Sequence, residues 1–338
     1  EQAMVMRLNT DGSLDKSYAS VGYKLFGFNG YKSASGKALA LDAKGRAVVV
    51  GRTSSHCGHN AVTVARLETD GSLDMSFGVA GRRAVKYNRA GSNSDSVAIQ
   101  KDGKIVAAGH LYNQANCSAG IMGTTVFRYR DNGSVDSSFA SGGKIEFNLP
   151  GQHHDQGRSV VLLANDDILV AGGDYYGGGS GFALIRLGKN GNHMWTKILS
   201  GGRIDSLALQ KDGKVIVSGE KIGRVHPDGS IDKSWFNGLV SGMKSNGWAG
   251  GDWSVALQAD GKVVTTSSNS KQFWLGRYTA NGAKDASWGS NGSLDLDLYS
   301  GDDRSRALLV QSDGRIVVVG STKTAAKGED VAVARVCP

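Results

Sequence analysis

Two short phrases recur along this chain, and their repetition constrains the fold more than any other feature. The first phrase reads TDGSLDKSY at residues 10–18 and returns as TDGSLDMSF, DNGSVDSSF and PDGSIDKSW. The second phrase, LDAKGRAVVVG at residues 41–51, returns as IQKDGKIVAAG, LQKDGKVIVSG, LQADGKVVTTS and VQSDGRIVVVG. Each copy of the second phrase has two apolar runs around an Asp-Gly or Lys-Gly pair. This pattern predicts a β-hairpin whose tight turn needs a positive φ.

The first phrase marks another hairpin. An alternating run such as VTVARLETDG precedes its turn, and a further strand such as KIEFNL follows it. One unit is therefore four antiparallel strands, and the turn of its first hairpin recurs along the chain. The turn glycines are Gly45, Gly103, Gly213, Gly261 and Gly314. A degenerate copy, LLANDDILVAG, fills the gap between the second and third of them.

Six units of roughly 50–60 residues have the period of propeller blades. A single four-stranded sheet cannot bury both of its faces, and radial packing against neighbouring sheets covers them. We therefore expect an all-β fold, a β-propeller of four-stranded antiparallel blades, with six blades preferred, seven as the alternative and an open β-solenoid as the runner-up. The prediction is one domain over residues 1–338. Its repeat units are 36–95, 96–156, 157–202, 203–250, 251–300 and 301–338, with 1–35 closing the ring.

The two ends of the chain are out of phase with this unit. Residues 3–8 have the pattern of a third strand, residues 22–28 that of a fourth strand, and residues 331–338 that of a third strand again. The last unit thus lacks a fourth strand. We expect residues near 22–28 to complete the last blade and so to tie the two ends of the chain together.

Both phrases together resemble the delta-60 repeat family of bacterial β-propeller domains, over nearly the whole chain. The resemblance implies a secreted, periplasmic or cell-surface bacterial protein, possibly part of a larger polypeptide. It implies no activity and transfers no functional residue. The copy RLGKNGNHMW at residues 186–195 departs from the pattern because it lacks the second aspartate. The unit around residues 203–235 is short, so we expect an irregular fourth blade.

The amino-acid composition limits the kinds of partner that this chain is expected to bind. The formal net charge is +8, from 39 basic and 31 acidic residues, which favours acidic partners. The basic residues are scattered through the turns rather than gathered in a block, so no nucleic-acid partner is predicted. No apolar run approaches the roughly 20 residues of a membrane helix, so no membrane insertion is predicted. The chain opens at Glu1 without a leader, as a processed or excised chain would.

The third strand and the turn after it carry repeated residues. The arginines are Arg7, Arg66, Arg128, Arg186, Arg224, Arg277 and Arg335. The aspartates are Asp15, Asp74, Asp136, Asp232 and Asp285, followed by the aromatics Tyr18, Phe77, Phe139, Trp235 and Trp288. We predict structural roles, with the aspartates on turn amides or arginines and the aromatics between blades. Calcium binding by Asn9, Asp11 and Asp15 is the competing hypothesis, but this loop offers fewer than the six to eight oxygens that calcium takes.

The long segments that do not repeat fall on the opposite face from the tight turns, because second-to-third loops and blade crossings share that face. Variable loops on a rigid scaffold are where binding residues concentrate. We therefore predict a binding face there. Its candidate residues are Tyr112, Asn113, His153, His154, Asp155, Tyr175, Tyr176, Trp248 and Trp253.

Cys57 and Cys117 occupy equivalent loops of adjacent blades, which makes a disulfide between them geometrically reasonable in an oxidising compartment, with two free thiols as the alternative. Cys337 has no obvious partner. The histidines of these loops raise a metal hypothesis, but zinc needs three or four converging ligands, and neighbours such as His153 and His154 point apart in an extended segment. We predict no metal and no cofactor. The histidines and the acid beside them are His56, His59, His110, His153, His154 and Asp155.

The sequence favours a non-catalytic, extracytoplasmic binding or adhesion module. Its expected partner is a polysaccharide or a protein at a cell surface, recognised through the long-loop face, and the positive charge suits an anionic glycan. No G-x-S-x-G nucleophile motif occurs, and we predict no catalytic residue. Two alternatives remain. One is a hydrolase or lyase that uses His153, His154 and Asp155, and the other is a structural spacer within a larger surface protein.

Overall fold

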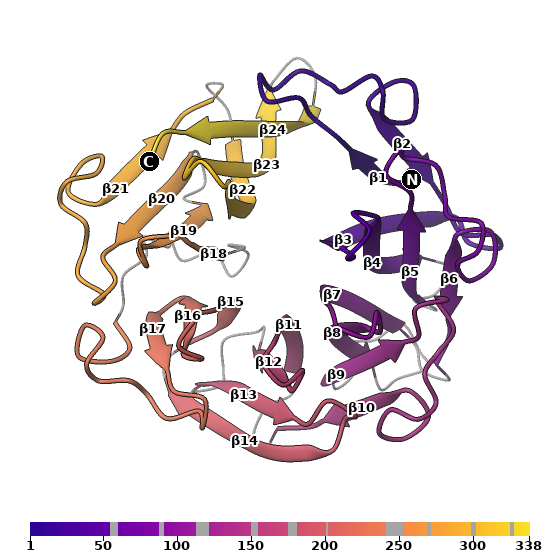
Figure 1. Cartoon of the computed structure of the whole chain (residues 1–338), viewed down its shortest axis with the longest axis horizontal. Coiled ribbons are helices and arrows are strands. Elements are labelled where there is room, and N and C mark those ends of the chain that lie inside the picture. Colours follow the sequence, from indigo (N-terminus) through magenta and orange to yellow (C-terminus); the bar gives the residue numbers. More distant parts are fainter. Residues whose placement is uncertain are drawn as a thin grey trace. The chain divides into compact units, whose positions relative to one another are not determined.

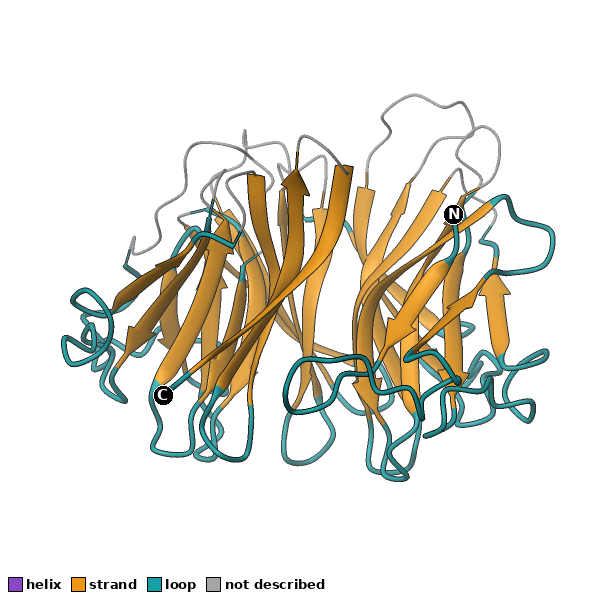
Figure 2. Cartoon of the chain, turned by 90° about the horizontal axis from the view of Figure 1, so that it is seen from above, coloured by secondary structure: helices purple, strands orange, loops and turns teal. Residues whose placement is uncertain are grey.

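The computed structural model describes eleven stretches of the chain. They are residues 1–54, 60–87, 91–112, 122–149, 155–174, 181–200, 202–240, 253–268, 272–298, 302–324 and 328–338. Every regular element in these stretches is a β-strand, as the orange arrows of Figure 2 show. The described residues accordingly include no helix with the length and apolar character to cross a membrane.

The chain forms two compact units, and Figure 1 labels their strands. Unit 1 consists of Glu1–Tyr175 and Ile185–Thr196, and unit 2 of Tyr176–Leu184 and Lys197–Pro338. Unit 1 opens with β1 (Ala3–Met6) and β2 (Tyr23–Phe26), followed by β3 (Ser33–Leu41), β4 (Ala47–Ser54), β5 (Val62–Leu67), β6 (Arg82–Val85), β7 (Gly91–Ile99), β8 (Ile105–Tyr112), β9 (Met122–Tyr129), β10 (Lys144–Phe147), β11 (Asp155–Leu162) and β12 (Ile168–Asp174).

The boundary between the units passes through β13 (Gly181–Leu187) and β14 (His193–Ser200). Unit 2 continues with β15 (Ile204–Leu209), β16 (Val215–Gly219), β17 (Ile222–Val225), β18 (Ser254–Leu257), β19 (Val263–Ser268), β20 (Phe273–Tyr278), β21 (Ser293–Leu296), β22 (Asp302–Val310), β23 (Ile316–Thr324) and β24 (Gly328–Val336).

Each sheet is an antiparallel meander in chain order. Sheets β3–β6, β7–β10, β11–β14 and β18–β21 have four strands, and β15–β17 and β22–β24 have three. In such a meander the first and third turns lie at the same end, and these are the two predicted tight turns. Gly45 has φ 77° in the first turn of β3–β6, and Asp166 takes φ 64° in the degenerate copy. The predicted hairpins are therefore present, including the one that lacks glycine.

Within each unit, successive sheets pack face to face. The first strands β3, β7 and β11 are neighbours in unit 1, and β15, β18 and β22 are neighbours in unit 2. Alternate residues of the middle strands meet between sheets. In one core of unit 1, Val64 of β5 and Phe127 of β9 are fully buried together with Phe77 from the turn after β5. Full burial of each such side chain stabilises the fold by about 1.5–3 kcal/mol.

The fold class predicted from the repeats is confirmed. It is an all-β, six-bladed β-propeller built from four-stranded antiparallel blades, and the six blades open with β3, β7, β11, β15, β18 and β22. The strands that open the blades begin within a few residues of the predicted repeat boundaries. The third-to-fourth hairpin predicted at the amino end is also present, as β1 and β2.

Residues near 22–28, predicted to complete the last blade, contain strand β2. Strand β2 pairs with β1, with Ala3 opposite Phe26 and Met6 opposite Tyr23, and these two strands form a sheet of their own. Residues 7–22 connect the two strands, and closing this loop costs less conformational entropy than joining segments at opposite ends of the chain. The last blade has the three strands β22, β23 and β24 in the described part of the chain.

The two irregular copies have structural counterparts. Without an aspartate after its turn, the RLGKNGNHMW copy runs directly into the strand His193–Ser200, which is longer than β6, β10 or β21 at the same position. The expected irregular fourth blade is β15–β17. Its fourth position is reduced to an isolated bridge between Ile222 and Val240.

Candidate functional site

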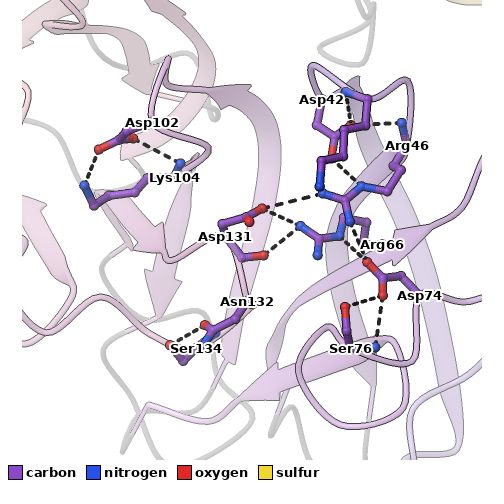
Figure 3. A network of polar contacts seen from close by, with 11 residues as sticks. Asp42, Arg46, Arg66, Asp74, Ser76, Asp102, Lys104, Asp131, Asn132 and Ser134 are labelled. Carbon is purple, nitrogen blue, oxygen red and sulfur yellow. Dashed lines mark hydrogen bonds and ion pairs between the residues drawn. The ribbon is translucent and has the colours of Figure 1, made fainter.

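The repeated arginine and aspartate form an ion pair across the hairpin, and both partners are buried in Arg66–Asp74, Arg128–Asp136 and Arg277–Asp285. In the hairpin of β5 and β6, Arg66 Nε donates to Asp74 Oδ2 at 2.7 Å. The other carboxylate oxygen, Asp74 Oδ1, accepts from the Ser76 backbone N–H at 2.9 Å and from Ser76 Oγ at 2.6 Å (Figure 3). Burial alone would raise the pKa of Asp74, but the hydrogen bonds from Ser76 and Arg66 lower this pKa to about 2. Asp74 is therefore a fixed anion.

The same arginine continues into the next blade. Arg66 Nη1 donates to the Asp131 carbonyl oxygen at 2.7 Å and to its carboxylate at 2.6 Å (Figure 3). Beside this contact, the Phe77 ring lies under the turn glycine Gly133, where an added Cβ would come within 2.8 Å of the ring. The backbone N–H of Gly78 donates to the carbonyl of Asn132 at 2.8 Å. One turn of this blade thus holds the corresponding turn of the next blade.

We call this arrangement the inter-blade latch. The arginine lies over the aromatic ring in four copies, with Cζ-to-centroid distances of 4.9 Å for Arg7 and Tyr18, 4.6 Å for Arg66 and Phe77, 4.7 Å for Arg128 and Phe139, and 4.9 Å for Arg277 and Trp288. Tyr18, Phe139 and Trp235 lie against Gly71, Gly191 and Gly282 as Phe77 lies against Gly133. The predicted inter-blade role of the aromatics is correct.

The turn proposed for calcium binding has its acidic oxygens engaged. Asp15 Oδ2 accepts from Arg7 Nε at 2.7 Å, and Asp15 Oδ1 accepts from Ser17 Oγ at 2.6 Å. Asp11 Oδ1 accepts from the N–H and the hydroxyl of Ser13. These contacts are Asx turns, which form without metal. In the stretches that the structure describes, no three His, Cys, Asp or Glu side chains form a metal-ion cluster.

Most predicted binding residues lie outside the described residues. Those residues are Asn113, His153, His154, Tyr175, Tyr176 and Trp248, together with Cys57 and Cys117 of the predicted disulfide and with His56 and His59. Tyr112 is the last residue of β8 and pairs with Gly91. Cys337 is exposed and is a free thiol.

Asp155 is described, and it is buried. The side chain is 1% exposed, and Oδ2 accepts from the backbone N–H of Leu149 at 2.8 Å. Asp303, at the matching position of β22, is 0% exposed and accepts from the Leu298 N–H at 2.8 Å. Asp155 therefore holds the crossing between two blades. The sequence analysis did not predict this role. Asp155 precedes the turn residue Asp166 by the same number of residues as Asp303 precedes Gly314, and this shared spacing could have indicated it.

The first strands carry a second repeated feature, a β-bulge. The register shifts between Gly36 and Ala38, and it shifts at the same place in β7, β11, β15 and β22. The extra residue is charged each time: Lys37, Asp95 and Arg158 in unit 1, and Asp205 and Arg306 in unit 2. Bulges re-aim side chains and are frequent beside functional sites. Each of these residues lies eight positions before the turn residue, a spacing that is visible in the sequence and could have located them.

In unit 1 these charges lie near one another. Asp95 Oδ2 is 3.2 Å from His110 Nδ1, and Asp95 Oδ1 accepts from Asn93 Nδ2 at 3.0 Å. Burial opposes ionisation of Asp95, yet His110, with the charges of Arg158 and Lys37, lowers the pKa of this carboxyl. His110 is 2% exposed, whereas Lys37 is exposed. Three neighbouring first strands thus place two cations around one anion.

In unit 2 the corresponding position of β18 is Trp253. It precedes Gly261 by the same eight residues, and its side chain is 5% exposed. The guanidinium of Arg203 lies over its ring, with Cζ 5.1 Å from the centroid, and Arg203 Nε donates to Asp205 Oδ2 at 2.9 Å. Trp253 is therefore packed inside the blade contact.

With this geometry established, the chain can be compared with known proteins. A family model, the β-propeller domain of unknown function DUF5122, matches residues 45–77, 100–139 and 311–336. Two of these stretches run from the first turn of a blade to the latch aromatic, Phe77 or Phe139. No curated protein matches the chain. The family match supports a β-propeller domain, in agreement with the strands.

Solved structures of similar fold are distant in sequence. A streptogramin B lyase structure has a TM-score of 0.51 at 13% identity, covering 88% of this chain and 82% of that one. A protein of unknown function from Dyadobacter fermentans has a TM-score of 0.53 at 14% identity, covering 88% and 93%. A glucose dehydrogenase has a TM-score of 0.51 at 12% identity, covering 90% and 96%. At these identities the likeness concerns the fold alone.

Proposed function

We propose that this chain is a non-catalytic binding module of the delta-60 repeat kind, displayed outside the bacterial cytoplasm, that recognises an anionic glycan or an acidic protein surface. The observation that carries the proposal is the charged cluster of unit 1, Lys37 and Arg158 around Asp95, on three neighbouring first strands. His110 lies two residues before the end of β8, from which the chain enters the non-repeating segment 113–121.

The chemistry favours an acidic partner. Lys37 is exposed, so its positive charge is accessible to a partner in solution. The net charge of +8 adds a long-range attraction for anions, which salt screens over about 8–10 Å. Binding should therefore weaken as ionic strength rises.

A charge reversal at Lys37 tests the proposal. The probes are immobilised polygalacturonate, alginate and heparin, with neutral dextran for comparison. We expect Lys37→Glu to bind the acidic probe at least about tenfold more weakly than Lys16→Glu, an exposed site with the same change of charge. Equal binding by the two variants, or equal binding of the native chain to dextran, would overturn the proposal.

The two competing functions predict other outcomes. A hydrolase or lyase built on His153, His154 and Asp155 would lose turnover in His154→Ala, although Asp155 already holds the Leu149 N–H. A structural spacer would bind none of the acidic probes. The binding module is preferred because its charged cluster is built from three strands and does not depend on Asp155.

A further inference from the structure

A cavity of about 600 Å³ lies in unit 2, where β15, β18 and β22 end. Its floor consists of the last residues of these three strands, Leu209, Leu257 and Val310. Each of them is followed by a glutamine that also lines the cavity. The volume falls within the roughly 300–1,000 Å³ of small-molecule sites, which are apolar hollows with a few placed polar groups.

The three glutamines present hydrogen-bond acceptors that the protein does not use. Among the described residues, the buried Oε1 atoms of Gln210, Gln258 and Gln311 have no hydrogen-bond partner. Gln258 is only 9% exposed. Their backbone groups close the tight turns, as in the bond from the Gln258 N–H to the Lys262 carbonyl at 2.9 Å. A buried acceptor without a donor costs about 1–3 kcal/mol. Rotation of these side-chain amides toward the cavity that the glutamines line would let a ligand that donates relieve this cost.

The same repeat position in unit 1 shows what a structural glutamine does. Gln100 Nε2 donates to the carbonyls of Asp166 at 3.2 Å and of Lys189 at 3.1 Å, and Gln100 Oε1 accepts from Arg128 at 3.3 Å. The other two unit 1 copies carry Asp42, which Arg46 binds, and Leu163. The open acceptors are thus specific to the three blades around the cavity.

From these observations we infer that the unit 2 cavity binds a neutral mono- or disaccharide. Sugar hydroxyls supply several donors around one ring, which suits three acceptors on three strands, and a sugar C–H face suits the Leu–Leu–Val floor. At the edge of the cavity Lys211 and Asp212 offset each other in charge. A charged ligand would lose hydration here without a compensating partner. This site is separate from the Lys37 cluster and lies at the tight-turn end of its strands.

The test is saturation-transfer NMR and titration with glucose, galactose, N-acetylglucosamine, maltose and cellobiose, with glucuronate as the charged comparison. We expect saturable binding of at least one neutral sugar, weakened about tenfold or more in Gln258→Leu and in Gln311→Leu. Gln2→Leu, which removes an exposed glutamine, should bind as the native chain does. Gln258→Leu also removes the bond of 3.4 Å from Nε2 to the Gly314 carbonyl, so its Tm is measured as well and binding is compared at a temperature where both chains are folded.

Three results would overturn the inference. They are no saturable binding of any neutral sugar, binding unchanged in both cavity variants, and tighter binding of glucuronate than of glucose. The outcome is separable from the function proposed above, because Lys37→Glu should leave sugar binding unchanged. Gln258→Leu should likewise leave binding to the acidic probes unchanged.

Discussion

The guanidinium of Arg66 lies over the ring of Phe77, with Cζ 4.6 Å from the ring centroid. The arginine therefore makes three kinds of contact at once: a cation–π contact, an ion pair with Asp74, and hydrogen bonds to Asp131 of the next blade. The Arg66 and Asp74 side chains are only 4% and 5% exposed. In this buried environment each contact is stronger than it would be at the surface. Removing one partner leaves a buried polar or charged group without its hydrogen bond or counter-charge.

Loss of the Asp74 charge should destabilise the fold strongly. Asp74→Asn removes the buried counter-ion of Arg66 and leaves only the carboxylate of Asp131, whose side chain is 60% exposed. We expect a loss of about 3–5 kcal/mol in the free energy of unfolding. Asp15→Asn is the matched control, because in that copy the Arg7 and Asp15 side chains are 39% and 23% exposed. Urea unfolding followed by circular dichroism gives both values. An equal loss in the two variants would contradict the role assigned to burial.

The latch should also set the acid stability. A hydrogen bond from Ser287 is the main cause that lowers the pKa of Asp285 to about 2, the value that Asp74 also reaches. An unfolded aspartate has a pKa of about 3.9, so these depressed values stabilise the fold above about pH 4. This stability is lost as pH falls from about 4 through about 2. Unfolding free energies measured from pH 5 to 2 should fall less steeply in Asp285→Asn than in the native chain, and identical slopes would count against the assignment.

Ionisation of Tyr278 should contribute to the loss of fold stability at alkaline pH. Burial raises the pKa of its phenol to about 12, and the ring packs 6.1 Å from that of Trp235. The neutral phenol is favoured in the fold, so its contribution is present below about pH 10 and is lost as pH rises toward 12. The buried hydroxyl has no hydrogen-bond partner among the described residues. Tyr278→Phe should therefore keep or raise the Tm at pH 7 and reduce the loss of Tm between pH 10 and 12. A lower Tm at pH 7 would show that the hydroxyl is bonded.

Two glycines with similar positive φ angles allow the cost of backbone strain to be measured apart from the cost of a steric clash. Gly12 has φ +87° and open space where an added methyl group would lie, whereas Gly133 has φ +78° and the Phe77 ring at 2.8 Å from that position. We expect Gly12→Ala to lose about 1–2 kcal/mol from backbone strain alone. Gly133→Ala should lose about 1–3 kcal/mol more, because the methyl group displaces the ring. Equal losses in urea unfolding would mean that the ring moves aside at no cost.

Much of the fold was predictable because it is encoded locally and then repeated. The eight-residue spacing from Arg66 to Asp74 places both side chains across one short hairpin, and the aromatic that follows lies where the next turn packs. The alternation of apolar residues and the Asp-Gly turns specify the strands for the same reason. The bulge positions are equally regular, since each lies eight residues before its turn residue. The same spacing could therefore have predicted Lys37 and Asp95 from the sequence.

Other features depend on which segments meet. Asp155 has the sequence appearance of a loop residue, yet the blade crossing brings the Leu149 N–H onto its carboxylate. Trp253 resembles a ligand-stacking aromatic, yet Arg203 and the neighbouring strand bury it. These outcomes follow from long-range packing, which a single repeat does not record.

The sequence by itself determined the hairpins, the blade repeat and the latch residues, because each depends on spacings of a few residues within one copy. Only the tertiary structure decided that Gln100 is fully bonded while Gln258 keeps an open acceptor. The two glutamines have the same local sequence position, and they differ because a side chain's partners come from the blade beside it.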